Sequence, residues 1–259
     1  MITNKNIDGG KPFDWGLASH DYAKYRDIYP EEFYRRIIAL GHCTAGQTVL
    51  DLGTGTGVLP RSMYQYGAKF IGTDISENQI AYAKKRSKGL DIDYYVSAAE
   101  DLTFPNASFD VITACQCFMY FDKSRLLPKL HSFLKPGGHF LILYMAWLPA
   151  ESEIAKTSET LVLKYNPSWS GGGMTRYTLD TPDWLNGRFA VANAVTYDID
   201  VPFTREQWNG RMKACRGIDA SLPQETIAAF ERAHLQYLAT VPPAFTIPHY
   251  ASILDLKKI

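Results

Sequence analysis

The amino-acid sequence predicts an α/β fold built on a doubly wound parallel sheet. Apolar segments of strand length alternate with helix-like segments from residue 48 to residue 144. The first apolar segment ends in a glycine-rich turn, and the last of this series follows the turn Lys-Pro-Gly-Gly. Such alternation is typical of parallel sheets, which bind ligands at the carboxyl ends of their strands. We therefore expect the functional site at residues 51–57, 74–76, 98–101 and 114–120.

The glycine-rich turn lies in the stretch T-V-L-D-L-G-T-G-T-G-V-L, residues 48–59. This pattern predicts a buried strand, a tight turn and the start of a helix. Gly53, Gly55 and Gly57 permit positive φ and let a ligand approach the backbone closely. The helix N-terminus behind the turn offers free N–H groups to an anionic ligand. We interpret the stretch as a nucleotide-cofactor cradle, the alternative being a plain strand-to-helix turn.

The segment before the first strand divides into a polar and an aromatic part. Residues 1–12 are polar and are expected to be disordered or loosely attached. Residues 13–30 carry too many aromatic side chains for a free tail. They either pack in the core against the sheet or form a flap over the cofactor, with Arg26 pairing a carboxylate. A helix over residues 31–40 is expected after Pro30, with acidic residues early and arginines late.

The second expected strand, residues 69–74, ends in a carboxylate. Asp74 lies 23 positions after Asp51, close to the spacing expected for a residue that binds ribose hydroxyls. The alternative is that Asp74 caps the next helix. Ser76 is the better N-cap because Gln79 can complete a capping box with it, which leaves Asp74 for the ligand.

The remaining elements follow from the same patterns. Strands are expected over residues 92–97, 109–114, 139–144, 191–201 and 245–256. Helices are expected over residues 122–134, 151–165, 205–215 and 223–238. The glycine-rich segment that starts at Trp169 reads as a mobile loop.

Composition restricts the function. Lys+Arg and Asp+Glu both total 27, so no basic field favours nucleic acid or an anionic membrane. No apolar run reaches the length of a membrane span, and the polar N-terminus lacks a signal-peptide core, so we expect a cytoplasmic protein. Cys43, Cys115, Cys117 and Cys215 fit neither a zinc pattern nor a disulfide framework. None of the six histidines forms a metal-like pair in the sequence, so no metal is expected.

Four motifs in register resemble class I S-adenosylmethionine-dependent methyltransferases: V-L-D-L-G-T-G-T-G, G-T-D-I-S, A-A-E-D-L-T-F-P-N-A-S-F-D-V-I-T and L-K-P-G-G-H-F-L-I. The resemblance covers roughly residues 20–145. The N-terminal arm and Q-C-F-M-Y-F-D resemble the small-molecule branch that contains trans-aconitate-methyltransferase-like enzymes. The resemblance implies a Rossmann-like, mostly parallel sheet of seven strands, with an antiparallel last strand near residues 245–256 and a helical lid.

The resemblance also implies S-adenosyl-L-methionine as cofactor, S-adenosyl-L-homocysteine as product and a small-molecule methyl acceptor. The residues implied at the methionine end of the cofactor are Arg26, Asp51, Gly53, Thr54, Gly55, Cys115 and Gln116. Those implied at its ribose and adenine are Asp74, Ile75, Ala99 and Glu100. Many relatives carry Gly-Asp in place of Ser97-Ala98, so an adenine contact by that acid is absent here.

The acceptor side departs from the family pattern as well. Many close relatives carry His-Trp where this chain has Met119-Tyr120, which removes an imidazole near the transfer site. Tyr120 is therefore the catalytic candidate, the alternative being a core aromatic residue. The candidates for the substrate pocket are Tyr22, Trp147, Arg211 and Arg216. The alternative is that the tryptophans are core residues and the arginines form a solvated helix face.

These observations lead to one expected organisation and function. Residues 1–40 form an arm and helix over the cofactor site, 41–150 the cofactor-binding core, and 151–259 the rest of the sheet with an inserted helical substrate lid. The expected reaction is in-line methyl transfer to an O, N or other nucleophile of a small molecule, driven by proximity and orientation. The alternatives are a non-catalytic cofactor-binding protein and an NAD-dependent oxidoreductase, which the G-x-G-x-G spacing disfavours. Acceptor identity and oligomeric state stay open.

Overall fold

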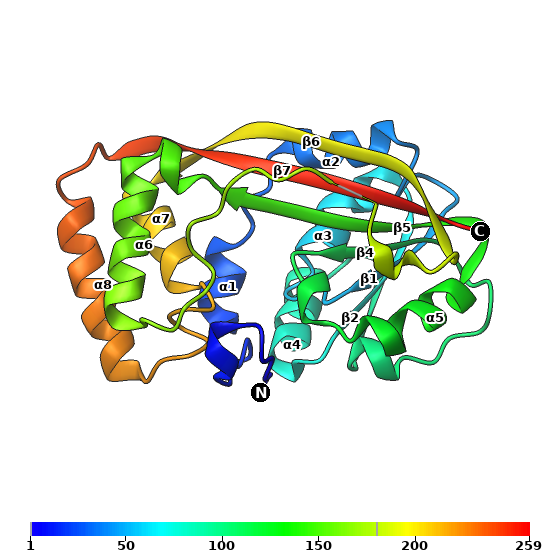
Figure 1. The fold of residues 1–259 in the computed structure, drawn as a ribbon, viewed down its shortest axis with the longest axis horizontal. Helices are drawn as coiled ribbons and strands as arrows, with labels where there is room; N and C mark the ends of the chain where they lie inside the picture. Colours follow the sequence, from blue (N-terminus) through cyan, green and yellow to red (C-terminus); the bar gives the residue numbers. More distant parts are fainter. Residues whose placement is uncertain (1, 180) are drawn as a thin grey trace. The chain divides into compact units, whose positions relative to one another are not determined.

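A computed structural model describes residues 2–179 and 181–259, without the side chain of Tyr22. Its sheet has seven strands in the order β3-β2-β1-β4-β5-β7-β6 (Figure 1). The strands are β1 (Thr48–Leu52), β2 (Lys69–Asp74), β3 (Ile92–Val96), β4 (Phe109–Cys115), β5 (Leu134–Trp147), β6 (Phe189–Thr204) and β7 (Ala244–Lys258). Strands β1 to β5 pair in parallel, and β7 runs opposite to β5 in Figure 1. The predicted Rossmann-like sheet with an antiparallel last strand is confirmed.

The chain forms two compact units, each assembled from several segments. Unit 1 comprises Met1–Ile28, Ala146–Tyr177 and Asp198–Tyr250. Unit 2 comprises Tyr29–Met145, Thr178–Tyr197 and Ala251–Ile259. The sequence-based division at residues 1–40, 41–150 and 151–259, with its helical lid, stays a prediction.

Unit 2 holds strands β1 to β4 and the helices that precede, connect and follow them. These helices are α2 (Glu31–Ala39), α3 (Val58–Met63), α4 (Glu77–Arg86) and α5 (Lys123–Phe133). The N-cap of α4 is Ser76, whose hydroxyl accepts a hydrogen bond from the Gln79 N–H, as the sequence predicts. The predicted capping box is wrong, because the Ser76 N–H donates to the Asp74 carboxylate and not to the Gln79 side chain. Asp122 caps α5 by accepting hydrogen bonds from the N–H groups of Ser124 and Arg125. These caps fix where each helix begins at the edge of the sheet.

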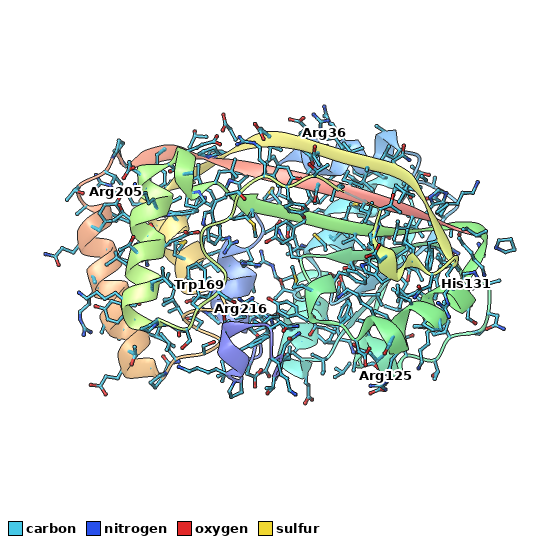
Figure 2. All side chains as sticks on the ribbon, viewed as in Figure 1. Arg36, Arg125, His131, Trp169, Arg205 and Arg216 are labelled. Atoms are coloured by element: carbon cyan, nitrogen blue, oxygen red, sulfur yellow. The ribbon has the colours of Figure 1, made fainter. Side chains whose placement is uncertain are left out.

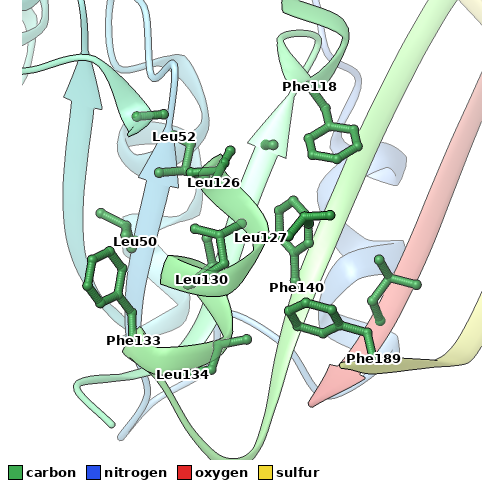
Figure 3. Close-up of a cluster of buried hydrophobic side chains, with 14 of the residues drawn as sticks. Leu50, Leu52, Phe118, Leu126, Leu127, Leu130, Phe133, Leu134, Phe140 and Phe189 are labelled. Atoms are coloured by element: carbon green, nitrogen blue, oxygen red, sulfur yellow. The ribbon is translucent and has the colours of Figure 1, made fainter. Parts of the chain in front are cut away.

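A buried apolar cluster joins α5 to the sheet (Figure 3). Leu50 of β1 and Phe140 of β5 are fully buried, and Leu126 and Leu130 of α5 are fully buried as well. The two leucines are four residues apart and therefore share one face of the helix. Each such side chain contributes about 1.5–3 kcal/mol by leaving water, so this cluster holds the carboxyl ends of β1 and β4 in place.

The Lys-Pro-Gly-Gly segment, residues 135–138, is part of strand β5 and not a separate turn before it. It lies within β5, where Phe109 pairs with Leu134 but Val111 pairs with His139. The extra residues of β5 form an irregular bulge against β4, and Gly137 takes a positive φ of 73° within it. A bulge bends a strand without ending it, which explains why β5 begins earlier than the expected residue 139.

Unit 1 contains the helices α1 (Ser19–Tyr25), α6 (Glu153–Tyr165), α7 (Arg205–Lys213) and α8 (Gln224–Leu238). Helix α1 falls in the aromatic segment for which the sequence predicts no helix. The last three match the expected helices to within a few residues. Trp208 of α7 is fully buried and contacts Trp147 edge-on, with ring centroids 5.7 Å apart. Aromatic packing thus fixes α7 within this unit.

The expectation that residues 1–12 are loosely attached is wrong for residues 2–12. Asp8 is 3% exposed and accepts a hydrogen bond of 2.6 Å from Arg216 Nε (Figure 2). Ile2 and Phe13 form an antiparallel bridge, and Phe13 is buried. A buried ion pair and a bridged backbone hold this polar segment, and neither contact can be read from its composition.

The expectation of a mobile loop after residue 168 is also not met. Trp169, which Figure 2 labels, is buried, with 5% of its surface exposed. A methyl group added at Gly217 would lie 2.7 Å from the Trp169 ring, so the indole is packed against the backbone there. Burial of a large ring ties down the start of the glycine-rich segment.

Two further findings concern the described residues as a whole. The four cysteines are free, and the sulfur atoms of Cys43, Cys117 and Cys215 are buried, as expected of small core thiols. Among the helices formed by residues 2–179 and 181–259, none is long and apolar enough to cross a bilayer.

The close approach of α1 and α7 gives a test of this packing. A methyl group at Gly210 would collide with the Tyr25 ring. We expect Gly210→Ala to lower the free energy of unfolding by about 1–2 kcal/mol, although alanine favours helix by about 1 kcal/mol. In a Tyr25→Ala background the same change should stabilise. Urea unfolding followed by circular dichroism measures both, and a stabilising Gly210→Ala in the wild-type background would contradict the packing.

Candidate functional site

The glycine turn connects β1 to α3 in unit 2. Gly53 and Gly55 each have a φ of 57°, and Gly57 has a φ of 73°. A methyl group at Gly53 would lie 2.8 Å from the Cys117 sulfur, and one at Gly57 would lie 2.9 Å from Cζ of Tyr94. Both the left-handed backbone and the close neighbours therefore require glycine. The predicted strand, turn and helix are confirmed.

Asp74 lies at the end of β2 and is bound directly to this turn. Its Oδ2 accepts a hydrogen bond of 2.9 Å from the Gly55 N–H, and its Oδ1 accepts one of 2.9 Å from the Ser76 N–H. The Thr54 N–H donates to the Thr73 carbonyl at 2.8 Å. Burial raises the pKa of Asp74, and the two N–H donors oppose this rise. The side chain of Ile75, next in the chain, is 56% exposed.

Asp51 lies deeper, behind the turn. It is 1% exposed, and its Oδ1 accepts a hydrogen bond of 2.6 Å from the Thr113 hydroxyl of β4. Burial raises the pKa of Asp51 to about 7, because the hydroxyls of Thr113 and Thr54 do not offset the lost hydration and the negative charge of nearby Asp74 raises the pKa further. A carboxyl that titrates near neutrality therefore lies under the loop that the sequence singles out.

The end of β4 closes the other side of the turn. Gln116 has a φ of 64°, which is uncommon for a residue with a side chain. Its N–H donates to the Leu143 carbonyl at 2.9 Å, and its side-chain amide donates to the Met145 carbonyl. These bonds hold a strained backbone at the carboxyl edge of the sheet, where strain is often associated with function. Cys115, one residue earlier, contacts the Tyr29 hydroxyl at 3.6 Å.

Ala99 and Glu100 belong to a short 3-10 helix, η3 (Ala99–Asp101), after β3. Ala99 is buried, and Glu100 Oε1 accepts a hydrogen bond of 2.7 Å from the Asp122 N–H. Glu100 therefore also supports the start of α5. The same edge of the sheet thus carries the residues predicted at positions 51–57, 74–76, 98–101 and 114–120.

This site coincides with a region of similarity to known proteins. A family model described as a methyltransferase domain matches residues 50–142. The chain contains a class I S-adenosylmethionine-dependent methyltransferase domain.

Two curated relatives illustrate the similarity. Over 127 residues the chain is 31% identical to "Ubiquinone biosynthesis O-methyltransferase" of Xanthomonas axonopodis pv. citri, covering 48% of this chain and 53% of the relative. Over 153 residues it is 36% identical to "Ubiquinone/menaquinone biosynthesis C-methyltransferase UbiE" of Desulfotalea psychrophila, covering 55% and 60%. The chain thus spans about half the length of the curated relatives it matches.

Solved structures share the fold over most of the chain. The YcgJ protein of Bacillus subtilis matches with a TM-score of 0.55 and 19% identity, covering 88% of this chain and 99% of that chain. A solved structure from Anaeromyxobacter dehalogenans matches with a TM-score of 0.59 and 19% identity, covering 89% and 96%. At this identity the comparison establishes the fold alone.

Tyr120 of the methyltransferase domain lies in the 3-10 helix η4 (Phe118–Tyr120), directly after the carboxyl end of β4. Its N–H donates to the Cys117 carbonyl at 2.9 Å, and its half-buried ring packs against the apolar cluster that contains Phe118. This packing favours the interpretation of Tyr120 as a core aromatic residue. Its catalytic role stays a prediction.

The candidates for the substrate pocket, and Arg26 of the cofactor set, lie in unit 1. The Trp147 Nε1–H donates to Glu159 Oε1 at 2.6 Å, and the Arg211 guanidinium lies 4.7 Å from the centroid of the Trp147 ring. Arg26 lies 5.9 Å from the Trp15 ring centroid. The Tyr22 side chain lies outside the described part of the structure. The pocket and the contact of Arg26 with the cofactor stay predictions.

The alternative of a solvated arginine face is wrong. Arg211 is 5% exposed, and Arg216 is paired with buried Asp8. The other half of that alternative, tryptophans in the core, agrees with Trp147, which is 6% exposed. Both arginines are thus held inside unit 1, where each contacts a partner that the sequence does not point to.

Sequence reasoning missed a residue near the end of β4. Tyr197 of β6 is half-buried, and its ring lies 3.9 Å from the Arg36 guanidinium of α2 (Figure 2). Burial raises the pKa of its hydroxyl, opposed by Arg36 and reinforced by Glu32 and Cys115. Tyr197 therefore lies near a residue implied at the sulfonium. A half-buried tyrosine in an alternating edge strand gives no such signal in the sequence.

A second correction concerns the histidines. Contrary to the expectation that none forms a metal-like pair, His42 and His139 both contact the Asp255 carboxylate. These residues lie in three distant parts of the chain, and only the sheet brings them together. Sequence spacing has no means of showing such a cluster.

The raised pKa of Asp51 predicts a pH-dependent cost in stability. Its pKa is about 7 in the folded state and about 3.9 in an unfolded chain. Between these values the folded state keeps a proton that the unfolded state releases, so stability falls as pH rises from about 4 to about 7. We expect Asp51→Asn to gain about 2–4 kcal/mol relative to wild type across this window, with no further gain above it.

Urea unfolding at about pH 4.5, 6 and 8 measures the difference in unfolding free energy between Asp51→Asn and wild type. Titratable groups that both proteins share contribute equally to the two values and cancel in the difference. Thr113→Val serves as the companion variant, because loss of the hydroxyl donor should move the titration of Asp51 to higher pH. A difference between wild type and Asp51→Asn that is the same at all three pH values would contradict the raised pKa.

Proposed function

We propose that the protein is a methyltransferase that uses S-adenosyl-L-methionine to methylate a small molecule. The observation that carries the proposal is the position of Asp74, which the Gly55 N–H fixes beside the glycine turn. A carboxylate held there can accept hydrogen bonds from the two hydroxyls of a ribose, since each oxygen accepts a single backbone bond and has further acceptor capacity. The exposed side chain of Ile75 offers an apolar surface for the adenine.

The methionine end of the cofactor would lie toward the glycine turn and the end of β4. Gly53 and Gly55 let it approach the backbone, and Asp51 supplies negative potential behind them for its amino group. Cys115 and Gln116 form the adjoining edge, and Gln116 is held there by its bonds to β5. These assignments support a bound donor whose sulfonium faces the edge of β4.

The bound donor supplies a methyl group on a positively charged sulfur. The S–CH3 bond breaks as the new bond to the acceptor forms, and S-adenosyl-L-homocysteine leaves with the electron pair. Because the leaving group is already good, the chain mainly has to align the three reacting atoms, which contributes several kcal/mol. An acceptor that is already a carboxylate needs no base, whereas a phenol or ammonium group has to lose a proton.

Curated relatives are named for ubiquinone and menaquinone biosynthesis and include O- and C-methyltransferases. The alignments cover 53% and 60% of the lengths of these two relatives. We therefore assign to this chain a small-molecule acceptor with an O, N or other nucleophile, and leave the acceptor atom to experiment. A non-catalytic cofactor-binding protein is the second candidate.

Calorimetric titration with S-adenosyl-L-methionine, S-adenosyl-L-homocysteine and NAD tests the cofactor assignment. We expect both sulfur nucleotides to bind and NAD not to bind. Asp74→Ala should weaken their binding by about ten- to a hundredfold, because it removes charged hydrogen bonds to the ribose. Asp93→Ala, which removes an exposed carboxylate from β3, is the matched control and should bind as the wild type does.

The outcomes separate the candidates. Binding of NAD alone would overturn the methyltransferase proposal. Equal binding of the sulfur nucleotides to Asp74→Ala and wild type would remove Asp74 from the site. Binding without methyl transfer to any member of a panel of phenols, amines and carboxylates would favour the non-catalytic candidate.

A further inference from the structure

A cluster of two histidines and an aspartate lies in unit 2, away from the glycine turn. His42 Nε2 lies 3.0 Å from Asp255 Oδ2, and His139 Nδ1 lies 2.6 Å from Asp255 Oδ1. One ligand atom from each of the three residues lies within 4.8 Å of the others. The two imidazole rings have centroids 4.5 Å apart. Two ring nitrogens and one carboxylate thus converge on one point.

The cluster is well enclosed. The side chain of Asp255 is 0% exposed and that of His42 is 6% exposed, whereas that of His139 is 21% exposed and leaves one side open to solvent. Asn193 of β6 donates its amide N–H to Asp255 Oδ2 at 2.7 Å and orients the carboxylate. A buried carboxylate costs several kcal/mol unless a cation or several donors compensate it. With both imidazoles neutral, the group carries one net negative charge.

We propose that His42, His139 and Asp255 bind one divalent transition-metal ion of the zinc class. Nitrogen from imidazole and oxygen from a carboxylate are the ligands that such ions prefer. Asn193 would act on the carboxylate from outside, as the hydrogen-bond partners of metal ligands commonly do.

The existing geometry needs only small changes to accept the ion. Ligand atoms about 2.0–2.2 Å from a tetrahedral ion lie roughly 3.3 Å from one another. The N···O contacts of 3.0 and 2.6 Å would widen by about 0.3 and about 0.7 Å, and the two nitrogens would approach one another from their present separation of at most 4.8 Å. The open side at His139 leaves room for water as the fourth ligand.

Binding would change the tautomer of both histidines. A carboxylate only accepts hydrogen bonds, so His42 Nε2 and His139 Nδ1 carry the hydrogens in their present contacts with Asp255. Each atom gives up its hydrogen when it coordinates the ion, and the neutral ring then carries that hydrogen on its other nitrogen. The two rings therefore change tautomer and release no net proton to the solution.

The place of the cluster in the fold points to a structural ion. His139 pairs in register with Val111, which pairs with Val49 near the start of β1, whereas Asp51 and Cys115 lie toward the opposite ends of their strands. The ion would join the loop before β1 to β5 and the C-terminal strand β7. A metal that binds the folded state only adds its binding free energy to stability, so it would hold the last strand in the sheet.

The test uses the full chain with any affinity tag removed and after treatment with a chelator. Zn²⁺ is titrated calorimetrically, and Co²⁺ is titrated by its visible absorption. We expect one ion per chain and a higher unfolding temperature with Zn²⁺. Asp255→Asn and His139→Gln should each weaken binding at least about tenfold. His131→Gln is the matched control, because His131 lies on α5 and contacts the Ile259 carbonyl.

Several results would overturn the proposal. Wild-type protein that takes up less than one ion per chain, or equal binding by His139→Gln and His131→Gln, would leave the cluster as a hydrogen-bonded ion pair. Asp255→Asn keeps the shape of the side chain, and the wild-type titration decides the matter even if a variant fails to fold. Because S-adenosyl-L-homocysteine should bind His139→Gln normally, failure here is distinguishable from failure of the proposed function.

Discussion

The hydrogen bond from the Gly55 N–H to Asp74 is the constraint on which the rest of the site depends. It joins the turn after β1 to the end of β2, and the bond from the Thr54 N–H to the Thr73 carbonyl reinforces it. Gly55 can offer its N–H in this direction because its φ is 57°. One backbone conformation therefore fixes the carboxylate, the turn and the start of α3 relative to one another.

The residues after β4 pack against the other side of the turn, where there is space for glycine alone. Cys117 donates its S–H to the Leu52 carbonyl at 3.1 Å and lies where a side chain at position 53 would be. Gln116, the residue before Cys117, adopts a positive φ and donates hydrogen bonds to two carbonyls of β5, which hold its backbone in place. The carboxyl edge of the sheet is thus assembled from short-range contacts among three neighbouring strands, and little of it can move independently.

Short-range patterns explain what the sequence could predict. The glycine spacing, the acid at position 74 and the capping pair Ser76–Gln79 each act within a few residues, and the strand, turn and helix they predict are present. The attachment of residues 2–12 depends on Asp8 and Arg216, which are 208 positions apart. The histidine cluster depends on His42 and Asp255, which are 213 positions apart. Neither pairing leaves a local pattern, so composition alone misread both segments.

Four buried or half-buried carboxylates show how hydrogen-bond donors and depth together set the pKa of an acid in this protein. The pKa of Asp51 is raised by burial because a hydroxyl is its main donor, and that of Asp74 is raised despite two N–H donors. Asp8 and Asp255 are also shielded from solvent but lie less deep, and their pKa values are lowered by hydrogen bonds from Arg216 and Ser170, and from His42, Asn193 and His139. Charged or multiple N–H donors outweigh the lost hydration at Asp8 and Asp255, whereas the donors at Asp51 and Asp74 do not. The carboxylates at the glycine turn are therefore the ones left short of donors, as a site that awaits a cationic amino group and a ribose diol requires.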